Sequence, residues 1–419
     1  MFDKDRWTEV YMALKSNKLR TFLTAFGVFW GIFMLIIMLG SGKGLENGVY
    51  YGMGDFATNS VFVWAQPTTK AYKGFKQGRR YHFNNEDTKA ILDHIPEIKL
   101  LAPRIQARGG DGDNNVVRGL KTGAFSILGD VPDVNKIDPV NMYSGRFLNE
   151  IDLLKNRKVA VIGRRVNDVL FEYDDAVGEY IKINGIFFQV IGVFHSMHSQ
   201  GWGEWQDQCV FIPFTTLQKT YNYGTRVGHY SITSKDNYTA SYVEDKVKAL
   251  LKRRHKIHPD DERAIGSHNV EKEFIKINQL FMGISGLVWI VGIGTLLAGI
   301  IGVSNIMLFI VKKRTKEIGI QRAIGASPSM IISSVITESV VLTGLAGWVG
   351  LFVGVVLLEL LSLAIEKSGG EQPMFTHPEV NFNLAMMALG ILILAGILAG
   401  IIPAKRAVSI KPIDAIRDE

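Results

Sequence analysis

The sequence is poor in cysteine, because Cys209 is the only one among 419 residues. A single cysteine excludes any disulfide within the chain, so each folded part must be held by an ordinary hydrophobic core. Cys209 lies in the strand-like run DQCVFIPF. We therefore expect it to be packed in a core rather than to serve as a reactive thiol or a metal ligand.

The sequence also lacks a nucleotide-binding phosphate loop. The nearest match is MLGSGKGLENG, residues 38–48. The phosphate loop has the pattern G-x-x-x-x-G-K-[ST] between a strand and a helix. Here Ile37 stands where the first glycine belongs, and Gly44 stands where the hydroxyl is needed. The stretch follows a long apolar run instead of a strand, so we expect no ATP site in it.

Metal-binding and catalytic patterns are also scarce. Two H-x-x-H pairs occur, His195 with His198 and His255 with His258. A metal site needs three or four ligands, and neither pair belongs to an H-E-x-x-H motif. We find no nucleophile–base signature, no internal repeat and no low-complexity tract. The sequence therefore predicts no catalytic residue, no metal ligand and no nucleic-acid partner.

What the sequence does contain is long apolar runs. Hydrophobic residues make up 47% of the chain, although 21% are charged, a mixture typical of a chain divided between membrane and water. A membrane-spanning helix needs about 20 mostly apolar residues. Five basic residues precede the first run and no cleavage site follows it, so this run is a permanent anchor. Four transmembrane helices are predicted, at residues 21–40, 280–311, 329–359 and 382–403.

Basic residues flank these runs unevenly. They are concentrated in residues 1–20, 312–328 and 404–419, whereas residues 360–381 hold one lysine and three acidic residues. The positive-inside rule then places both termini and the 312–328 loop in the cytoplasm. Residues 41–276 and the loop 360–381 lie on the opposite side.

The excursion of residues 41–276 has the pattern of a folded domain. Strand-like runs alternate with helical patterns at 85–95, 164–171 and 238–254, and Asn184-Gly185 is typical of a two-residue hairpin turn. We expect an outer lobe at 130–206 inserted into an inner lobe built from 55–129 and 207–260. The predicted fold is therefore a four-span α-helical transmembrane domain, with a large two-lobed α+β domain between its first two spans.

The loop KKRTKEIGIQRAIGASPSM, residues 312–330, carries the strongest signal. Gly325 is placed to end a short helix, and Ser327-Pro328 is a helix-start signature. Ile318, Ile320, Ala323 and Ile324 are expected to give that helix one apolar side. The helix is either a relay between a docked partner and two spans, or a basic amphipathic linker on anionic lipid.

Several motifs resemble the MacB/FtsX-type ABC permeases. The loop is similar to the coupling segment of that family, which carries R-T-x-E-I-G-I-x-x-A-[IL]-G-A. Residues 13–32 resemble the start of the family's first span, residues 338–354 resemble its glycine-rich third span, and residues 158–194 resemble its periplasmic domain. The resemblance covers nearly the whole chain. On this resemblance we assign ATPase coupling to Arg314, Thr315, Glu317, Ile318, Gly319, Ala323, Gly325 and Ala326, and we add Arg322, which lies between the motif positions.

This resemblance implies a non-catalytic permease in the bacterial inner membrane. It would work as a homodimer, or as a heterodimer with a related permease. Separately, the glycines of the second span favour a dimer contact made by the first and second spans. A separate ABC ATPase subunit would bind the ATP and Mg²⁺. ATP hydrolysis would then drive the periplasmic domain by mechanotransmission for export or extraction of a substrate, with a periplasmic adaptor and an outer-membrane channel as further partners.

Other functions remain open at this point. One is an FtsX-like signal relay that activates extracytoplasmic enzymes, although FtsX has a much smaller periplasmic domain. Another is a lipoprotein-releasing permease with the same four spans. A secondary transporter is disfavoured, because four spans with one intramembrane carboxylate offer little for ion coupling.

Two further features are candidates for function. Glu338 is an intramembrane carboxylate, which is either a proton site or conformational latch, or the partner of a basic residue of the coupling segment; we favour the pairing. Gly40, Gly42 and Gly44 are expected to form a flexible or closely packed stalk hinge where the first span leaves the membrane.

Six glycines of the second span are expected to let helices pack closely, either between subunits or within one. They are Gly283, Gly286, Gly292, Gly294, Gly299 and Gly302.

Overall fold

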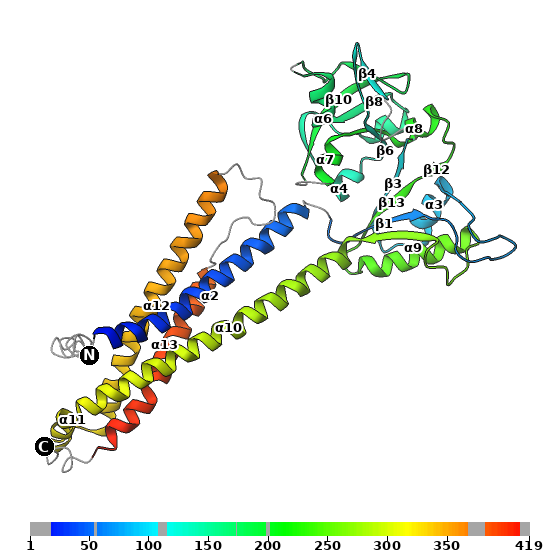
Figure 1. The fold of residues 1–419 in the computed structure, drawn as a ribbon. Helices are drawn as coiled ribbons and strands as arrows, with labels where there is room; N and C mark the ends of the chain where they lie inside the picture. Colours follow the sequence, from blue (N-terminus) through cyan, green and yellow to red (C-terminus); the bar gives the residue numbers. More distant parts are fainter. Residues whose placement is uncertain are drawn as a thin grey trace. The chain divides into compact units, whose positions relative to one another are not determined.

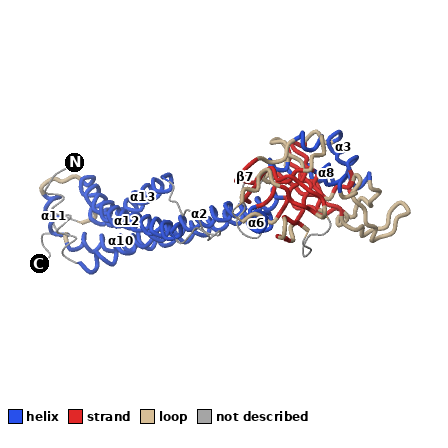
Figure 2. Tube along the Cα trace, turned by 90° about the horizontal axis from the view of Figure 1, so that it is seen from above, coloured by secondary structure: helices blue, strands red, loops and turns tan. Residues whose placement is uncertain are grey.

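The fold is described from a computed structural model that covers residues 18–53, 57–107, 115–172, 174–197, 202–367 and 382–410. The chain divides into two compact units. We call residues 1–49 with 280–419 the membrane unit, and residues 50–279 the α/β unit. Figure 2 shows that helices make up the first and that the strands lie in the second.

The division between the units falls inside two long helices, α2 (Lys18–Met53) and α10 (Val270–Lys313). Both helices extend beyond the predicted spans at 21–40 and 280–311. No proline occurs between the end of the first apolar run and Pro67, so nothing in the sequence stops α2 early. Each boundary between the units therefore falls within a helix.

The membrane unit contains α2, α10, a short helix α11 (Thr315–Ala323), α12 (Pro328–Lys367) and α13 (Phe382–Val408). In the described part of the chain, four of these helices are long and apolar enough to cross a membrane: α2, α10, α12 and α13. The predicted four-span domain is confirmed. Part of the predicted loop at 360–381 is helical instead, since α12 continues to Lys367; residues 368–381 lie outside the described residues.

The four long helices of the membrane unit are labelled in Figure 1, and glycines allow their backbones to approach closely. A Cβ atom on Gly299 of α10 would lie 3.3 Å from the backbone nitrogen of Val28 in α2. A Cβ atom on Gly350 of α12 would lie 2.6 Å from the carbonyl oxygen of Phe29. Such approach of backbones is the use of small residues in membrane helices. Of the six glycines noted in the second span, Gly292 and Gly299 serve packing within the chain, because their Cβ positions lie against Leu35 and Val28 of α2.

The Gly350→Ala substitution is expected to destabilise the membrane unit. The added methyl group would meet the Phe29 carbonyl at 2.6 Å, and a backbone atom cannot move aside as a side chain can. We expect a loss of about 1–3 kcal/mol, typical of overpacking. Thermal unfolding of the purified chain in detergent measures this loss. The matched control is Gly286→Ala, because no atom lies within 4 Å of the Cβ position at Gly286. Equal unfolding midpoints for the two variants would contradict the packing scheme.

In its described residues, the α/β unit is built on one twelve-stranded sheet, with a second sheet of two short strands. The order in the large sheet is β14-β1-β13-β3-β6-β11-β8-β10-β9-β4-β5, with β7 paired to β10, and the small sheet pairs β12 with β2. The strands are β1 (Ser60–Ala65), β2 (Phe83–Asn84), β3 (Ile98–Gln106), β4 (Val116–Arg118), β5 (Lys121–Gly123), β6 (Ser126–Asp130), β7 (Val140–Gly145), β8 (Val159–Gly163), β9 (Tyr180–Ile183), β10 (Ile186–Ser196), β11 (Cys209–Pro213), β12 (Arg226–Val227), β13 (His229–Ser234) and β14 (Ile265–Asn269).

Among the described residues of the α/β unit, seven helices accompany the sheets. They are α3 (Asn85–His94), α4 (Val134–Ile137), α5 (Glu150–Leu154), α6 (Arg164–Leu170), α7 (Trp202–Asp207), α8 (Phe214–Thr220) and α9 (Ala240–Arg254). The three helices predicted from sequence correspond to α3, α6 and α9. The predicted hairpin is formed by β9 and β10, with Asn184 and Gly185 at φ values of 43° and 91° in the turn.

The predicted division into lobes at residues 130 and 206 differs from the observed pairing. Strand β4 pairs with β9, and β11 pairs with both β6 and β8. Strands β4 and β11, which lie outside residues 130–206, therefore belong to the same part of the sheet as β8 and β9, which lie inside that range. Hydrophobic patterns do not reveal which distant strands pair, so the boundary could not be read from sequence.

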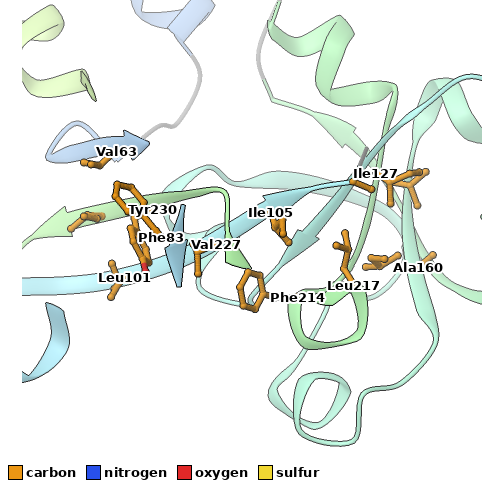
Figure 3. Close-up of a cluster of buried hydrophobic side chains, with 14 of the residues drawn as sticks. Val63, Phe83, Leu101, Ile105, Ile127, Ala160, Phe214, Leu217, Val227 and Tyr230 are labelled. Carbon is orange, nitrogen blue, oxygen red and sulfur yellow. The ribbon is translucent and has the colours of Figure 1, made fainter. Parts of the chain in front are cut away.

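One continuous core supports both halves of the sheet. Phe83 and Tyr230 stack with ring centroids 5.5 Å apart, and both side chains are fully buried. Ile105, Ile127 and Leu217 continue this core (Figure 3). Cys209 is fully buried at the start of β11, as predicted, and its thiol donates to the Trp205 carbonyl over 3.3 Å. Burial raises the pKa of the Cys209 thiol.

His229 on β13 gives the α/β unit a pH-dependent stability. Burial and the nearby Arg104 guanidinium lower the pKa of His229 to about 3. In the unfolded chain His229 has an ordinary histidine pKa near 6.5, so between pH ~6.5 and pH ~3 it is protonated in the unfolded chain but not in the folded one. Stability is therefore fully present above pH ~6.5 and falls as the pH drops toward ~3.

We expect the His229 contribution to decline by about 2 kcal/mol between pH ~7 and pH ~5. Chemical denaturation of the wild-type chain and of His229→Gln at these two pH values measures it. The variant should lose that much less stability on acidification. If both proteins respond to pH alike, His229 is not the group responsible.

Candidate coupling site

Helix α11 forms where the sequence predicts a short helix and a corner. Helix α10 ends at Lys313, and α11 ends at Ala323. Gly325 has φ +107°, and the Ala326 amide donates to the Gln321 carbonyl over 2.9 Å. This left-handed residue and the back-directed bond are the usual helix C-terminal motif. Ser327 Oγ then accepts from the Met330 amide at 3.4 Å, and Pro328 begins α12.

The apolar residues of α11 do not share one side, which corrects the prediction. Ile318 is 8% exposed and belongs to the core of the membrane unit. Ile320 is 43% exposed and Ile324 is 82% exposed, and Ala323 is also exposed. Successive helical residues turn by 100°, so these three lie on the side opposite Ile318. Helix α11 therefore has an anchored face and a separate exposed apolar face.

An ion pair connects α11 to α12. Arg314 Nη1 donates to Glu338 Oε1 over 2.9 Å, and its Nε donates to Glu317 Oε2 over 2.8 Å. The side chains of Arg314 and Glu338 are 21% and 11% exposed, whereas that of Glu317 is 64% exposed. Burial acts to lower the pKa of Arg314, but the two carboxylates outweigh it and raise that pKa above its ordinary value. The pairing predicted for Glu338 is therefore present.

A second contact connects α11 to the end of α13. Arg322 Nη1 donates to the carbonyl oxygens of Val408 and Ile410, each over 2.6 Å. The last carbonyls of a helix lack partners within the helix, so Arg322 caps α13. Thr315 Oγ1 donates to the Lys312 carbonyl over 2.7 Å, and Gly319 is buried. The predicted residues thus bring the ends of α10, α12 and α13 together around α11. The role of Arg322 as a cap was not predicted, since its acceptors are backbone atoms that sequence cannot show.

The three glycines at residues 40–44 lie within helix α2 and have no left-handed φ. Gly40 is buried, and a Cβ atom there would lie 2.3 Å from Leu358 Cδ1 of α12. The Cβ position at Gly42 has no atom within 4 Å, and Gly44 is buried. Gly40 is therefore a packing position. The phosphate-loop interpretation has no support from the fold, because the stretch is helical.

The histidines noted in the sequence contact carboxylates in the α/β unit. His195 Nδ1 lies 3.2 Å from Asp207 Oδ2, and His255 Nε2 lies 2.7 Å from Asp87 Oδ2. His198 is outside the described residues. Asp87 also caps α3 through the Asn84 amide. Among the described residues, no group of three or more His, Cys, Asp or Glu has a metal-binding arrangement.

Comparison with known proteins agrees with this layout. Residues 21–250 match the MacB-like periplasmic core domain, and residues 289–412 match the FtsX-like permease C-terminal domain. The pyoverdine export ATP-binding/permease protein PvdT of Pseudomonas savastanoi pv. phaseolicola is 30% identical over 414 residues. This alignment covers 96% of the present chain and 58% of PvdT. The macrolide export ATP-binding/permease protein MacB of Bdellovibrio bacteriovorus is 28% identical, over 98% of this chain and 61% of that protein.

A solved structure, the periplasmic region of MacB from Actinobacillus actinomycetemcomitans, is similar to 53% of this chain and 94% of its own, with 18% identity and a TM-score of 0.42. The present chain spans about three fifths of the length of the two curated relatives. The first domain match alone covers more than half of the chain, and the second covers most of the membrane unit. The chain belongs to the family of MacB/FtsX-type ABC transporter permeases.

Proposed function

We propose that this chain couples ATP hydrolysis on a separate ATPase subunit to conformational change in the α/β unit, and so drives export or extraction of a periplasmic substrate. Family membership supports an ABC ATPase as a partner. Placing the ATPase on another polypeptide, with its ATP and Mg²⁺, is part of the proposal. The proposal also places the termini and α11 in the cytoplasm and the α/β unit in the periplasm.

The observation that carries the proposal is the two-faced character of α11. Ile318 fixes one face in the membrane unit, while Ile320 and Ile324 leave the other face exposed. Exposed apolar residues beside charged ones are typical of protein-binding surfaces. A partner that docks on this face would move α11 as a rigid piece. The Arg314–Glu338 and Arg322–Val408 contacts would pass that movement to α12 and α13.

The exporter is preferred to a signal relay because of the size of the α/β unit. It spans residues 50–279 and is built on a twelve-stranded sheet, and the match to the MacB-like core domain includes most of it. We propose that the permease works as a dimer and meets a periplasmic adaptor and an outer-membrane channel. Recovery of the chain with a cell-wall hydrolase instead would favour the signal relay, and release of lipoproteins would favour a lipoprotein-releasing permease.

The docking face is tested by Ile324→Asp. A charge at this exposed position should disrupt an apolar contact without affecting folding, because Ile324 is 82% exposed. We expect the amount of ABC ATPase that co-purifies with the tagged chain from native membranes to fall by at least about tenfold, since an interface hot spot contributes about 2 kcal/mol or more. The control is Leu120→Asp, which introduces the same charge at another exposed aliphatic residue, in the α/β unit. An ATPase recovered equally with both variants would refute docking at α11.

A further inference from the structure

A groove lies among the ends of α10, α11 and α13, apart from the exposed apolar face of α11. Its volume is about 710 Å³. Lys312 of α10 and Lys405 and Arg406 of α13 line it, together with the apolar side chains of Leu308, Val311 and Ile402. Helices α10 and α13 are two of the candidate membrane spans, so the groove lies where spans end.

The charge in this groove is of one sign. None of its lining residues is acidic. In the described part of the chain, Lys312, Lys405 and Arg406 form no ion pair, in contrast with Arg314, which contacts two carboxylates. Arg322 is likewise engaged, with two backbone carbonyls. Three cations that share a cavity repel one another, and an anion placed among them would relieve that repulsion.

The apolar wall narrows the choice of anion. Ile402 is 60% exposed although it is a large aliphatic residue, and Leu308 is half-buried on the neighbouring helix. Both precede the basic residues by three or four positions, which is about one helical turn toward the membrane interior. A phosphate bound among the cations would thus have its acyl chains beside apolar side chains. Basic pockets between membrane helices are known to suit acidic lipid headgroups.

We propose that this groove binds the phosphate of an anionic phospholipid. Arg406 provides the planar fork that suits two phosphate oxygens, and Lys312 and Lys405 supply point charges. Because the site joins α10 to α13, a bound lipid would hold together the ends of two helices that also contact α11. This inference concerns lipid alone and does not depend on the identity of the ATPase or of the transported substrate.

The test uses the full chain, freed of lipid in a neutral detergent and titrated with phosphatidylglycerol while bound lipid is counted by native mass spectrometry. We expect Lys405→Gln with Arg406→Gln to weaken binding by about 25-fold, since each basic residue near anionic lipid contributes about a fivefold factor. The control is Lys313→Gln with Lys316→Gln. It removes the same charge from exposed neighbours that do not line the groove, and binding should change by less than about threefold.

Two further ligands distinguish a phospholipid from free phosphate, and a further variant replaces the double variant if that protein does not fold. Phosphatidylcholine should bind at least about tenfold more weakly than phosphatidylglycerol, and inorganic phosphate alone should not displace the lipid. If the double variant fails to fold, Lys312→Gln on α10 should still weaken binding by about fivefold. The proposal is overturned if the control pair weakens binding as much as the groove pair, if phosphatidylcholine binds equally well, or if inorganic phosphate competes fully for the site.

Discussion

Replacing Asp130 with leucine is expected to lower the free energy of unfolding of the α/β unit by about 3–5 kcal/mol. Asp130 ends β6, and its Oδ1 accepts from Arg104 Nε of β3 over 2.6 Å. The two side chains are 0% and 5% exposed. Removing the carboxylate would leave the Arg104 charge buried without its partner, and this costs far more than the pair itself contributes.

The position of the pair adds to this effect. Strands β3 and β6 join the two halves of the large sheet, through Ile105 opposite Gly129 and Gln106 opposite Leu128. An uncompensated charge at this junction should therefore affect the whole unit.

Two controls isolate the cause of this loss. Combining Arg104→Met with Asp130→Leu removes both charges and should recover much of the stability. Asp236→Leu breaks an exposed pair, Lys99–Asp236, whose side chains are 54% and 84% exposed, and should cost less than about 1 kcal/mol. Chemical denaturation measures all of these variants. An Asp130→Leu protein as stable as Asp236→Leu would show that Arg104 finds another partner.

The second large effect is expected for Glu338→Gln. This substitution should weaken the response of the α/β unit to ATP while the ATPase stays bound. The substitution keeps the shape of the side chain but removes the charge that holds Arg314 of the α11 segment against α12. We expect the ATPase to remain bound, because Glu338 lies on α12 and not on the exposed face of α11. The response of the α/β unit to ATP should fall by at least about tenfold, the effect of losing about 1.4 kcal/mol of coupling.

Hydrogen exchange in residues 60–269, compared with and without ATP in the co-purified complex, reports this response without knowledge of the substrate. Glu359→Gln is the matched control, since it makes the same change at an exposed position near the other end of α12. If Glu338→Gln retains the full ATP-dependent change in exchange, the Arg314–Glu338 pair is not part of the relay.

The sequence predicts which segments form helices and strands better than it predicts which strands pair with one another. Apolar runs identify the four long helices because a span must satisfy its own backbone and expose apolar side chains to lipid. Asn184-Gly185 and Gly325 were recognisable because a positive φ restricts the residue type. In contrast, nothing local in residues 116–123 or 209–213 reveals which distant strands they join, so the predicted lobe boundary does not follow the strand pairing.

The same limit applies to the coupling site. The helix and its ends were predictable from capping residues, and the pairing of Glu338 was predictable because a buried carboxylate requires a partner. The opposite placement of Ile318 and Ile324 follows from helical geometry and was misread as a single apolar side. The capping of α13 by Arg322 depends on tertiary contact with backbone carbonyls, which carry no sequence signal.

The exposed face of α11 is expected to contact an ATPase, and site-specific photo-crosslinking detects such a contact. A photo-crosslinking amino acid is placed at residue 324 and irradiated in native membranes, with the same amino acid at residue 120 as control. We expect residue 324, and not residue 120, to crosslink to an ABC ATPase. Crosslinks from residue 324 to lipid alone, under conditions in which the protein is active, would contradict it.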